Sequence, residues 1–190
     1  MEQHLLSGPG PVMDVLIVLL GAPCGSFAAL LADRLPRGRP VVLSRSRCRA
    51  CGRALRWWEL APILSFLLLR GRCGRCGAAI PGWLLQAEIA GLALGGLAVW
   101  AGLGLAGAAA LWCLLALILS DMRHFRLPDH LTAALLVLAF AVAAFPDATM
   151  RPDLAAAGRA LTGAAVAAGL FLALSLGYRA LRGRHGMGAG

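Results

Sequence analysis

Residues 83–120 read WLLQAEIAGLALGGLAVWAGLGLAGAAALWCLLALILS, the longest apolar run of the chain. Over its whole length it carries one charged side chain, Glu88. A helix needs about 20 apolar residues to cross a bilayer, so the stretch is long enough for two crossings. The glycines from Gly102 to Gly107 mark a tight turn between them. The sequence therefore predicts two membrane helices joined by a turn.

The rest of the chain has the same character. Of its 190 residues, 59% are hydrophobic and 14% are charged, whereas a soluble domain carries about 25% charged residues. We therefore expect an all-α fold, a polytopic membrane helix bundle with about five spans present. The predicted spans are Val12–Ala32, Trp83–Ala101, Leu103–Ser120, Leu131–Phe145 and Ala160–Tyr178, of which the fourth is short.

Arginine is concentrated in a few connections between these spans. Eleven of the 18 basic residues lie between Arg34 and Arg75, where the only acid is Glu59. Such a basic loop can bind nucleic acid, but the bias of cytoplasmic loops toward basic residues explains it more simply. We therefore predict no nucleic-acid partner. The loop, the Arg123–Arg126 connection and the Arg179–Arg184 tail are placed in the cytoplasm, with the N-terminus outside and the C-terminus inside.

Two CxxC pairs lie within this basic loop. Cys48 and Cys51 form the first pair and Cys73 and Cys76 the second, with 21 residues between the pairs. Each pair is followed by a glycine, as in zinc knuckles, where the turn needs a residue that tolerates a positive φ. Four thiolates at such a spacing can close a tetrahedral site, so we predict a structural zinc ion bound by all four cysteines.

Two disulfides and a redox-active dithiol are the alternatives for these cysteines. A reducing cytoplasm disfavours stable disulfides, and a redox CxxC needs no matched second pair. The nearby arginines should lower the thiol pKa values and favour metal binding. The other two cysteines, Cys24 and Cys113, lie in apolar stretches and are interpreted as small hydrophobic residues.

Residues 57–69 form an apolar stretch inside the same loop. The stretch is too short to cross a bilayer and is interrupted by Pro62. Trp57 and Trp58 at one end are typical of a segment in the lipid headgroup region. A small hydrophobic core beneath the cysteines is an equally good interpretation, and the sequence leaves both open.

Acidic residues in or beside membrane spans need a reason, because each costs about 2.5–3.5 kcal/mol at a helix centre. Asp14 and Asp33 can mark the ends of the first span, whereas Glu88 lies inside the second. Asp121 ends the third span, where an acid opposes the helix dipole, so a purely structural role is disfavoured there. Asp129 is well placed to cap the next helix. Asp121 therefore stands out as a candidate for chemistry.

In this order the motifs resemble those of the type IV prepilin peptidases, a family of bifunctional leader peptidases and N-methyltransferases. The matching stretches are Gly25-Ser26-Phe27, Asp33-Arg34-Leu35-Pro36, the two CxxC pairs, Arg56–Phe66, Glu88, Asp121–Asp129 as D-x-x-x-x-x-L-P-D, and His185–Gly190 as the start of a G-x-G-D element. Ala28-Ala29 and Pro81-Gly82-Trp83 depart from the family pattern.

The resemblance implies a membrane aspartic endopeptidase of the bacterial inner membrane. It would cleave the basic leader of type IV prepilins or pseudopilins at the cytoplasmic face and methylate the new N-terminus with S-adenosylmethionine. Asp121 would be the first catalytic aspartate and the Asp of G-x-G-D the second. Because the chemistry needs both carboxylates and the chain stops at Gly190, just before the second, we expect a truncated and proteolytically inactive chain.

These features divide the chain into three parts. A first membrane span covers residues 1–33, a cytoplasmic four-cysteine loop covers 34–82, and a membrane peptidase core, incomplete at its C-terminus, covers 83–190. Two other functions remain open. A non-catalytic membrane scaffold would bind a cytoplasmic partner through its zinc loop, and a membrane thiol oxidoreductase would use its CxxC pairs.

Overall fold

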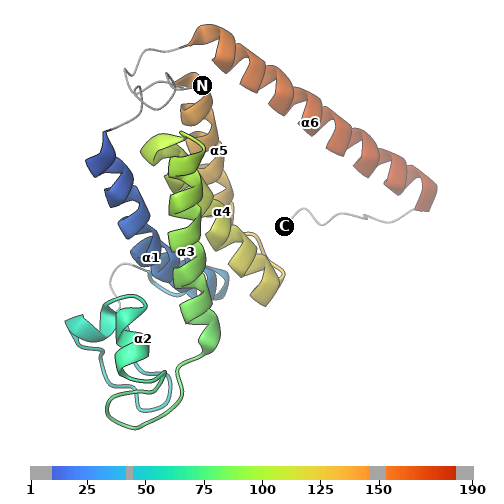
Figure 1. The fold of residues 1–190 in the computed structure, drawn as a ribbon. Coiled ribbons are helices and arrows are strands. Elements are labelled where there is room, and N and C mark those ends of the chain that lie inside the picture. The colour runs from blue at the N-terminus through green and yellow to red at the C-terminus, as the bar shows by residue number, and fades with distance from the viewer. Residues whose placement is uncertain (1–9, 42–44, 146–152, 183–190) are drawn as a thin grey trace. The chain divides into compact units, whose positions relative to one another are not determined.

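The computed structural model describes residues 10–41, 45–145 and 153–182, and these residues are mostly helical (Figure 1). Two isolated β-bridges are the only extended pairing within them. The all-α prediction is therefore confirmed. In chain order the elements are α1 (Pro11–Arg34), the 3-10 helices η2 (Leu35–Arg37) and η3 (Trp57–Leu60), α2 (Leu64–Leu68), α3 (Gly82–Trp100), α4 (Gly104–His124), α5 (Asp129–Ala144) and α6 (Leu154–Arg182).

Four helical segments of the described chain are long and apolar enough to cross a membrane. They are Pro11–Arg37, Gly82–Trp100, Gly104–His124 and Leu154–Ala180, and they match four of the five predicted spans. The remaining prediction, Leu131–Phe145, corresponds to α5. Its 16 residues reach about 24 Å, which is shorter than the roughly 30 Å hydrocarbon core of a bilayer.

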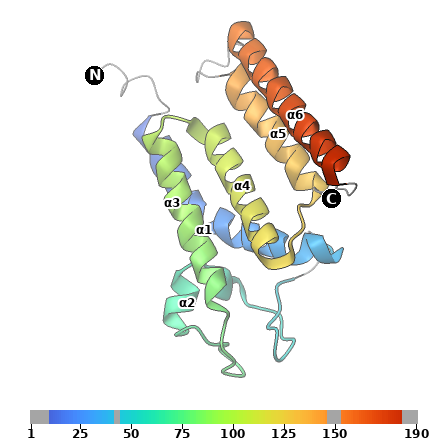
Figure 2. The same cartoon turned by 90° about the vertical axis from the view of Figure 1, so that its right-hand side faces the viewer.

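The chain divides into two compact units, Met1–Leu138 and Ala139–Gly190. In the first unit α1, α3 and α4 pack side by side (Figures 1 and 2). Gly21 and Gly25 of α1 lie against Gly91 of α3, so closely that a Cβ atom on any of the three would collide with the backbone of the other helix. Such close approach through small residues is the usual way for helices to associate in lipid.

Side chains fill the remaining space between these helices. Ile17, Ala98, Ala108 and Trp112 form one buried cluster, and the indole N–H of Trp112 donates a hydrogen bond to the Gly91 carbonyl at 3.0 Å. The described chain forms a second cluster from Ala28, Leu115, Ala116, Leu117 and Leu131. The two clusters fix α4 against the α1–α3 pair, so the ends of the three helices hold defined positions.

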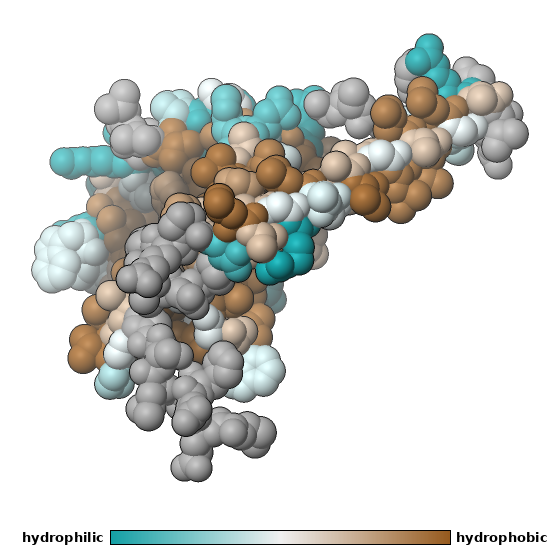
Figure 3. Space-filling view, turned by 90° about the horizontal axis from the view of Figure 1, so that it is seen from above, coloured by the Kyte–Doolittle hydropathy of each residue, from teal (hydrophilic) through white to brown (hydrophobic). Residues whose placement is uncertain are grey.

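The second unit contains the helix α6. Asp153 caps its N-terminus, because the carboxylate Oδ1 accepts the backbone N–H groups of Ala155 and Ala156 at 2.9 Å each. Most residues of the helix are apolar, and Figure 3 shows apolar side chains along the face turned to the viewer. A helix that is apolar on all sides is typical of a membrane span.

Candidate functional site

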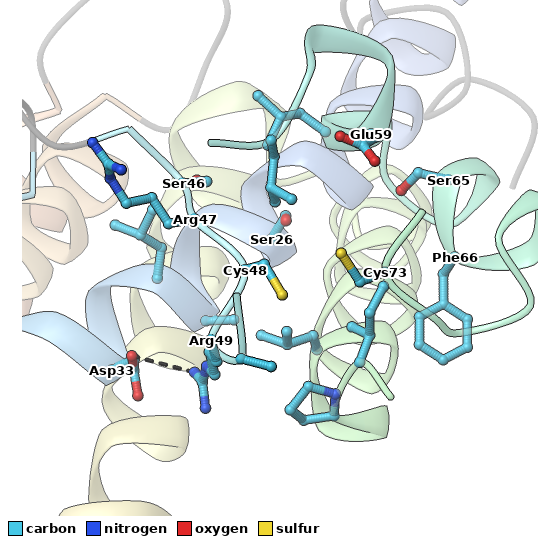
Figure 4. Close-up of a pocket in the computed structure, with 18 of the residues that line it drawn as sticks. Ser26, Asp33, Ser46, Arg47, Cys48, Arg49, Glu59, Ser65, Phe66 and Cys73 are labelled. Atoms are coloured by element: carbon cyan, nitrogen blue, oxygen red, sulfur yellow. Dashed lines mark ion pairs between the residues drawn. The ribbon is translucent and has the colours of Figure 1, made fainter. Parts of the chain in front are cut away.

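The four cysteines of the loop come together at one point. Their Sγ atoms all lie within 4.8 Å of one another, with 3.8 Å between those of Cys48 and Cys76. The sulfur atoms of Cys48 and Cys73 point toward one another (Figure 4). Tetrahedral zinc–sulfur bonds of about 2.3 Å require sulfur atoms about 3.8 Å apart. The cluster can therefore hold a metal ion, and all four of its cysteines are free thiols.

Each CxxC pair is presented by the same local turn. In the first, the Cys48 N–H donates to the Arg53 carbonyl at 2.9 Å, and in the second the Cys73 N–H donates to the Ala78 carbonyl at 2.8 Å. Gly52 and Gly77 close the two turns, each with a φ of 69°, the left-handed conformation that the sequence predicts for them. The described loop thus contains two matching knuckles, and each contributes two sulfur atoms.

The first thiol of each knuckle is prepared for metal binding. The backbone N–H groups of Cys76 and Arg75 point at the Cys73 sulfur and lower its thiol pKa to about 6. The N–H groups of Cys51 and Ala50 likewise lower the pKa of Cys48. At Cys76 the Ala78 N–H acts in the same direction, but burial and the neighbouring thiols outweigh it and raise the pKa to about 11. Thiolates are the form that binds metals, so Cys48 and Cys73 are the natural first ligands.

A buried ion pair connects the knuckles to η3. The Arg53 guanidinium donates to both carboxylate oxygens of Glu59, at 2.6 and 2.9 Å, and lies 3.9 Å from the Cys73 sulfur. The Arg56 N–H donates to the same carboxylate at 2.8 Å. Arg53 above all, and then this N–H, hold the pKa of Glu59 below its usual range. The pairing was not predicted, because eleven arginines surround the single acid in the sequence.

A cavity of about 960 Å³ lies between the cysteine loop, the C-terminal part of α1 and the first turns of α3. Six arginines and Glu88 line it. Figure 4 shows Ser26, Asp33 and Phe66 of the same lining, with Arg47 and Arg49. Asp33 pairs with Arg37 at 2.6 Å and with Arg49 at 3.3 Å. Small-molecule sites have volumes of roughly 300–1,000 Å³, so the cavity is large enough for a ligand of nucleoside size.

Asp121 lies in the last turn of α4, which continues to His124, beyond the predicted end of the span at Ser120. Phe125, at a φ of 50°, ends the helix, and its N–H donates to the Asp121 carbonyl at 2.9 Å. The buried Ser120 hydroxyl donates to the Arg126 carbonyl at 2.7 Å, which holds the turn that follows. The Asp121 side chain itself is exposed.

The end of α4 is connected to the cysteine loop through Trp83. The Arg123 guanidinium lies 4.0 Å from the centroid of the Trp83 ring, and that of Arg49 lies 5.8 Å from it. Figure 2 shows the end of α4 and the beginning of α3 at the same end of this unit as the loop. The structure thus places Asp121 and the four cysteines at one end of the helices. The predicted G-x-G-D element, His185–Gly190, lies outside the described residues.

Comparisons with known proteins agree with the motifs. A family model described as the bacterial peptidase A24 N-terminal domain matches residues 19–101, and one described as the type IV leader peptidase family matches residues 108–190. No solved structure matches the chain at a significant level.

Curated relatives carry the name prepilin leader peptidase/N-methyltransferase. The protein of Burkholderia pseudomallei (strain 1026b) is 38% identical over 175 residues, which cover 90% of this chain and 52% of the relative. That of Stutzerimonas stutzeri is 34% identical over 172 residues, 86% of this chain and 56% of the relative. That of Myxococcus xanthus (strain DK1622) is 42% identical over 60 residues, 32% of this chain and 18% of the relative.

The chain spans about half the length of the curated relatives that it matches over most of its sequence. The two family models together account for nearly all of the chain, in the order that the motifs predict. The chain belongs to the type IV leader peptidase family.

Proposed function

We propose that the protein is a membrane aspartic endopeptidase that removes the leader of type IV prepilins or pseudopilins, with Asp121 as one of its two catalytic carboxylates. Membership of the leader peptidase family carries this proposal. Asp121 supports it, because it is an exposed acid in the last turn of α4. A second carboxylate, from the G-x-G-D element, would share a proton with it, so that one acid activates water while the other protonates the substrate carbonyl.

We place this chemistry on the cytoplasmic side of the bacterial inner membrane. The cysteine loop carries eleven arginines and lies at the same end of the first unit as Asp121. Basic residues beside membrane spans remain in the cytoplasm during insertion, which supports this orientation. A protease-cleavable tag in the 39–45 segment tests the orientation. We expect protease added outside the cell to cleave it only after the inner membrane has been permeabilised.

The catalytic assignment is tested by Asp121→Asn in the complete product of the gene. We expect cleavage of a co-expressed prepilin, measured by its mobility on a gel, to fall by about a thousandfold, because removal of an acid–base group typically costs 10²–10⁴ in rate. Asp14→Asn is the matched control, since Asp14 lies in the first turn of α1 and should not affect cleavage. Prepilin processing at the parent rate by Asp121→Asn would show that the carboxylate has another role.

The cavity beside the cysteines favours a second activity, N-methylation with S-adenosylmethionine. Its arginines can bind the carboxylate of this ligand, Asp33 and Glu88 can accept hydrogen bonds from its ammonium or ribose groups, and Phe66 can pack on its purine. The bound ligand would supply the methyl group. Residues around the cavity thus fit the chemical groups of the methyl donor.

A cavity-filling variant tests this second activity separately from proteolysis. Ser26→Leu places a larger side chain in the cavity, and we expect it to weaken binding of S-adenosylmethionine, measured by calorimetry, by at least about tenfold, a loss of about 1.4 kcal/mol. Gly96→Ala is the control, because a Cβ atom there meets nothing within 4 Å. Unchanged affinity in Ser26→Leu would place the methyl donor elsewhere.

The cysteine cluster is proposed to hold zinc in a structural role. Four sulfur ligands close the tetrahedron and leave no coordination position for a substrate.

A further inference from the structure

Residues 57–68 carry a group of exposed apolar side chains. Trp57 and Leu68 are 85% and 79% exposed, and Leu60, Leu64 and Leu67 are at least half exposed. Leu64, Leu67 and Leu68 follow the spacing that places side chains on one face of a helix. Phe66 points the other way, with its ring against Gly71. Leu60 lines the cavity beside the cysteines. A core beneath the cysteines therefore accounts for Phe66 but leaves the outer apolar face, Trp57, Leu64, Leu67 and Leu68, uncovered.

This outer apolar face contains no charge. Glu59 is the only charged residue from 57 to 69, and it is turned inward, 8% exposed, against Arg53. The ion pair and the Arg56 N–H satisfy its carboxylate within the protein. The segment therefore presents an apolar surface outward, and its one charge, Glu59, is paired within the protein and does not oppose entry of that surface into lipid.

One hydrogen bond fixes the depth of the segment. The Ile63 N–H donates to Glu88 Oε2 at 2.7 Å. Glu88 lies six residues beyond Gly82, the first residue of α3, which is about 9 Å along the helix axis. The headgroup region on each side of a bilayer is only about 5–8 Å thick. If α3 enters the membrane at its first residue, the Glu88 backbone lies deeper than the headgroup region, and the bond holds Ile63 close to Glu88.

The hydrogen bond to Glu88 and the preceding proline hold the turn at Ile63 beside α3. Ile63 has a φ of 62°, which a β-branched residue rarely adopts, and it follows Pro62 directly. Its N–H has Glu88 as its acceptor, so the bond also supplies a partner for an acid inside a candidate span. Figures 1 and 2 both show α2 beside the first turns of α3.

Arginines flank the segment on both sides. Arg56 precedes it, Arg70 and Arg72 follow it, and all three side chains are exposed. Arg56 also lies over the Trp58 ring, 6.0 Å from its centroid. Indole rings and arginines are typical of the headgroup region, where arginine is attracted to anionic lipids. We infer that residues 57–68 are a membrane-interface segment, which inserts its outer apolar face into an anionic phospholipid bilayer beside α3.

Fluorescence quenching by lipid tests this inference. The chain is reconstituted into vesicles of phosphatidylethanolamine and phosphatidylglycerol, with or without lipids brominated near the carbonyl end of the acyl chain. The contribution of Trp57 is the difference in tryptophan fluorescence between the parent and Trp57→Phe. This substitution is at an exposed position and should leave the fold intact. We expect brominated lipid to remove more than about half of this contribution, because the indole should lie at the depth of the bromine atoms.

Two other tryptophans calibrate the measurement. Trp100 ends α3 and is 85% exposed, so its contribution should also be quenched, whereas Trp112 is 8% exposed in the helix packing and should be protected. Trp57 emission that behaves like that of Trp112 toward brominated lipid would overturn the inference. Quenching of Trp57 by aqueous acrylamide instead would place the face in water, and protection from both quenchers would place it against a protein.

Variants of Glu88 test the depth argument. Glu88→Gln keeps a carbonyl oxygen for the Ile63 N–H and should retain the lipid quenching of Trp57. Glu88→Leu removes the acceptor, and we expect it to reduce this quenching at least twofold. Equal quenching in both variants would show that the bond does not set the depth. Neither measurement depends on proteolysis, so the inference and the proposed peptidase activity can fail separately.

Discussion

At the scale of single residues, Glu59 organises a loop in which every other charged residue from Arg34 to Arg75 is an arginine. Its carboxylate is buried, accepts three hydrogen bonds and connects η3 to the knuckle that contains Arg53. Removal of one partner from a buried pair leaves the other charge without compensation, which is more harmful than loss of the bond alone. Glu59 should therefore contribute to the order of the whole cysteine loop.

Glu59→Gln should lower the free energy of local opening of the loop at neutral pH by about 1–3 kcal/mol, the usual cost of losing a charged hydrogen bond. Hydrogen exchange of the amides of residues 48–60 measures this as faster exchange. The lowered pKa of Glu59 means that its contribution is full at neutral pH and is lost as the pH falls through that value. The difference between parent and variant should therefore vanish in acid. Arg75→Gln, which also removes one charge from the loop, should exchange like the parent.

That the four cysteines form a cluster could be predicted from the sequence, whereas their supporting contacts could not. A CxxC pair followed by glycine encodes its own turn, so local spacing was sufficient to identify Gly52 and Gly77. The pairing of Glu59 with Arg53, by contrast, depends on how the closed loop selects one arginine among eleven. The bond between Ile63 and Glu88 crosses 25 residues and exists only once the loop has folded onto α3.

At the scale of helices, the contact between α1 and α3 relies on glycine. A Cβ atom on Gly91 would collide with the Gly21 carbonyl and the Gly25 backbone. In a membrane, helices gain little from the hydrophobic effect, so close backbone packing supplies much of their association.

Gly91→Leu should therefore separate α1 from α3 and destabilise the bundle by at least about 1–3 kcal/mol, the usual cost of overpacking. Thermal unfolding in mild detergent measures the loss. Gly96→Leu adds the same side chain to the same helix at a position with nothing within 4 Å, so it should leave the melting temperature unchanged. A similar loss in both variants would mean that lipid-facing bulk, not the helix contact, is responsible.

Trp83 connects the end of α4 to the cysteine loop. It stacks with Arg123 near Asp121 and lies beside Arg49 of the cysteine loop. Because a cation–π contact contributes about 0.5–2 kcal/mol, Trp83→Leu should slow prepilin cleavage by the complete gene product about two- to thirtyfold. Trp83→Phe should retain most of the rate, and Trp100→Leu, at the other end of α3, all of it. Equal rates for Trp83→Leu and the parent would show that the stack does not position the end of α4.

The apolar runs predicted the helices well but misplaced some of their ends. α4 continues through Arg123 and His124 because basic side chains are favourable at a helix C-terminus, and it ends only where Phe125 becomes left-handed. The apolar pattern alone suggested an end at Ser120. Similarly, a continuous apolar run at residues 131–145 suggested a span, but the helix that forms there is shorter than a bilayer core.

At the scale of the whole molecule, the cysteine cluster brings together two CxxC pairs that are 21 residues apart in the sequence. We expect one zinc ion per chain by elemental analysis, with four thiols that become reactive only after chelation. Cys51→Ser should lose most of the metal, whereas Cys24→Ser, in α1, should keep it. Thiols that react freely in the metal-loaded protein would instead favour the thiol oxidoreductase.

The two knuckles meet in space but are made one after the other. During synthesis the first leaves the ribosome with two sulfur atoms and must wait for Cys76 before a four-coordinate site can close. Only residues 77–81 then precede Gly82, where α3 begins. If the site holds zinc, all four of its ligands are therefore made just before α3, and the complete site is available to a metal from the moment that α3 is synthesised.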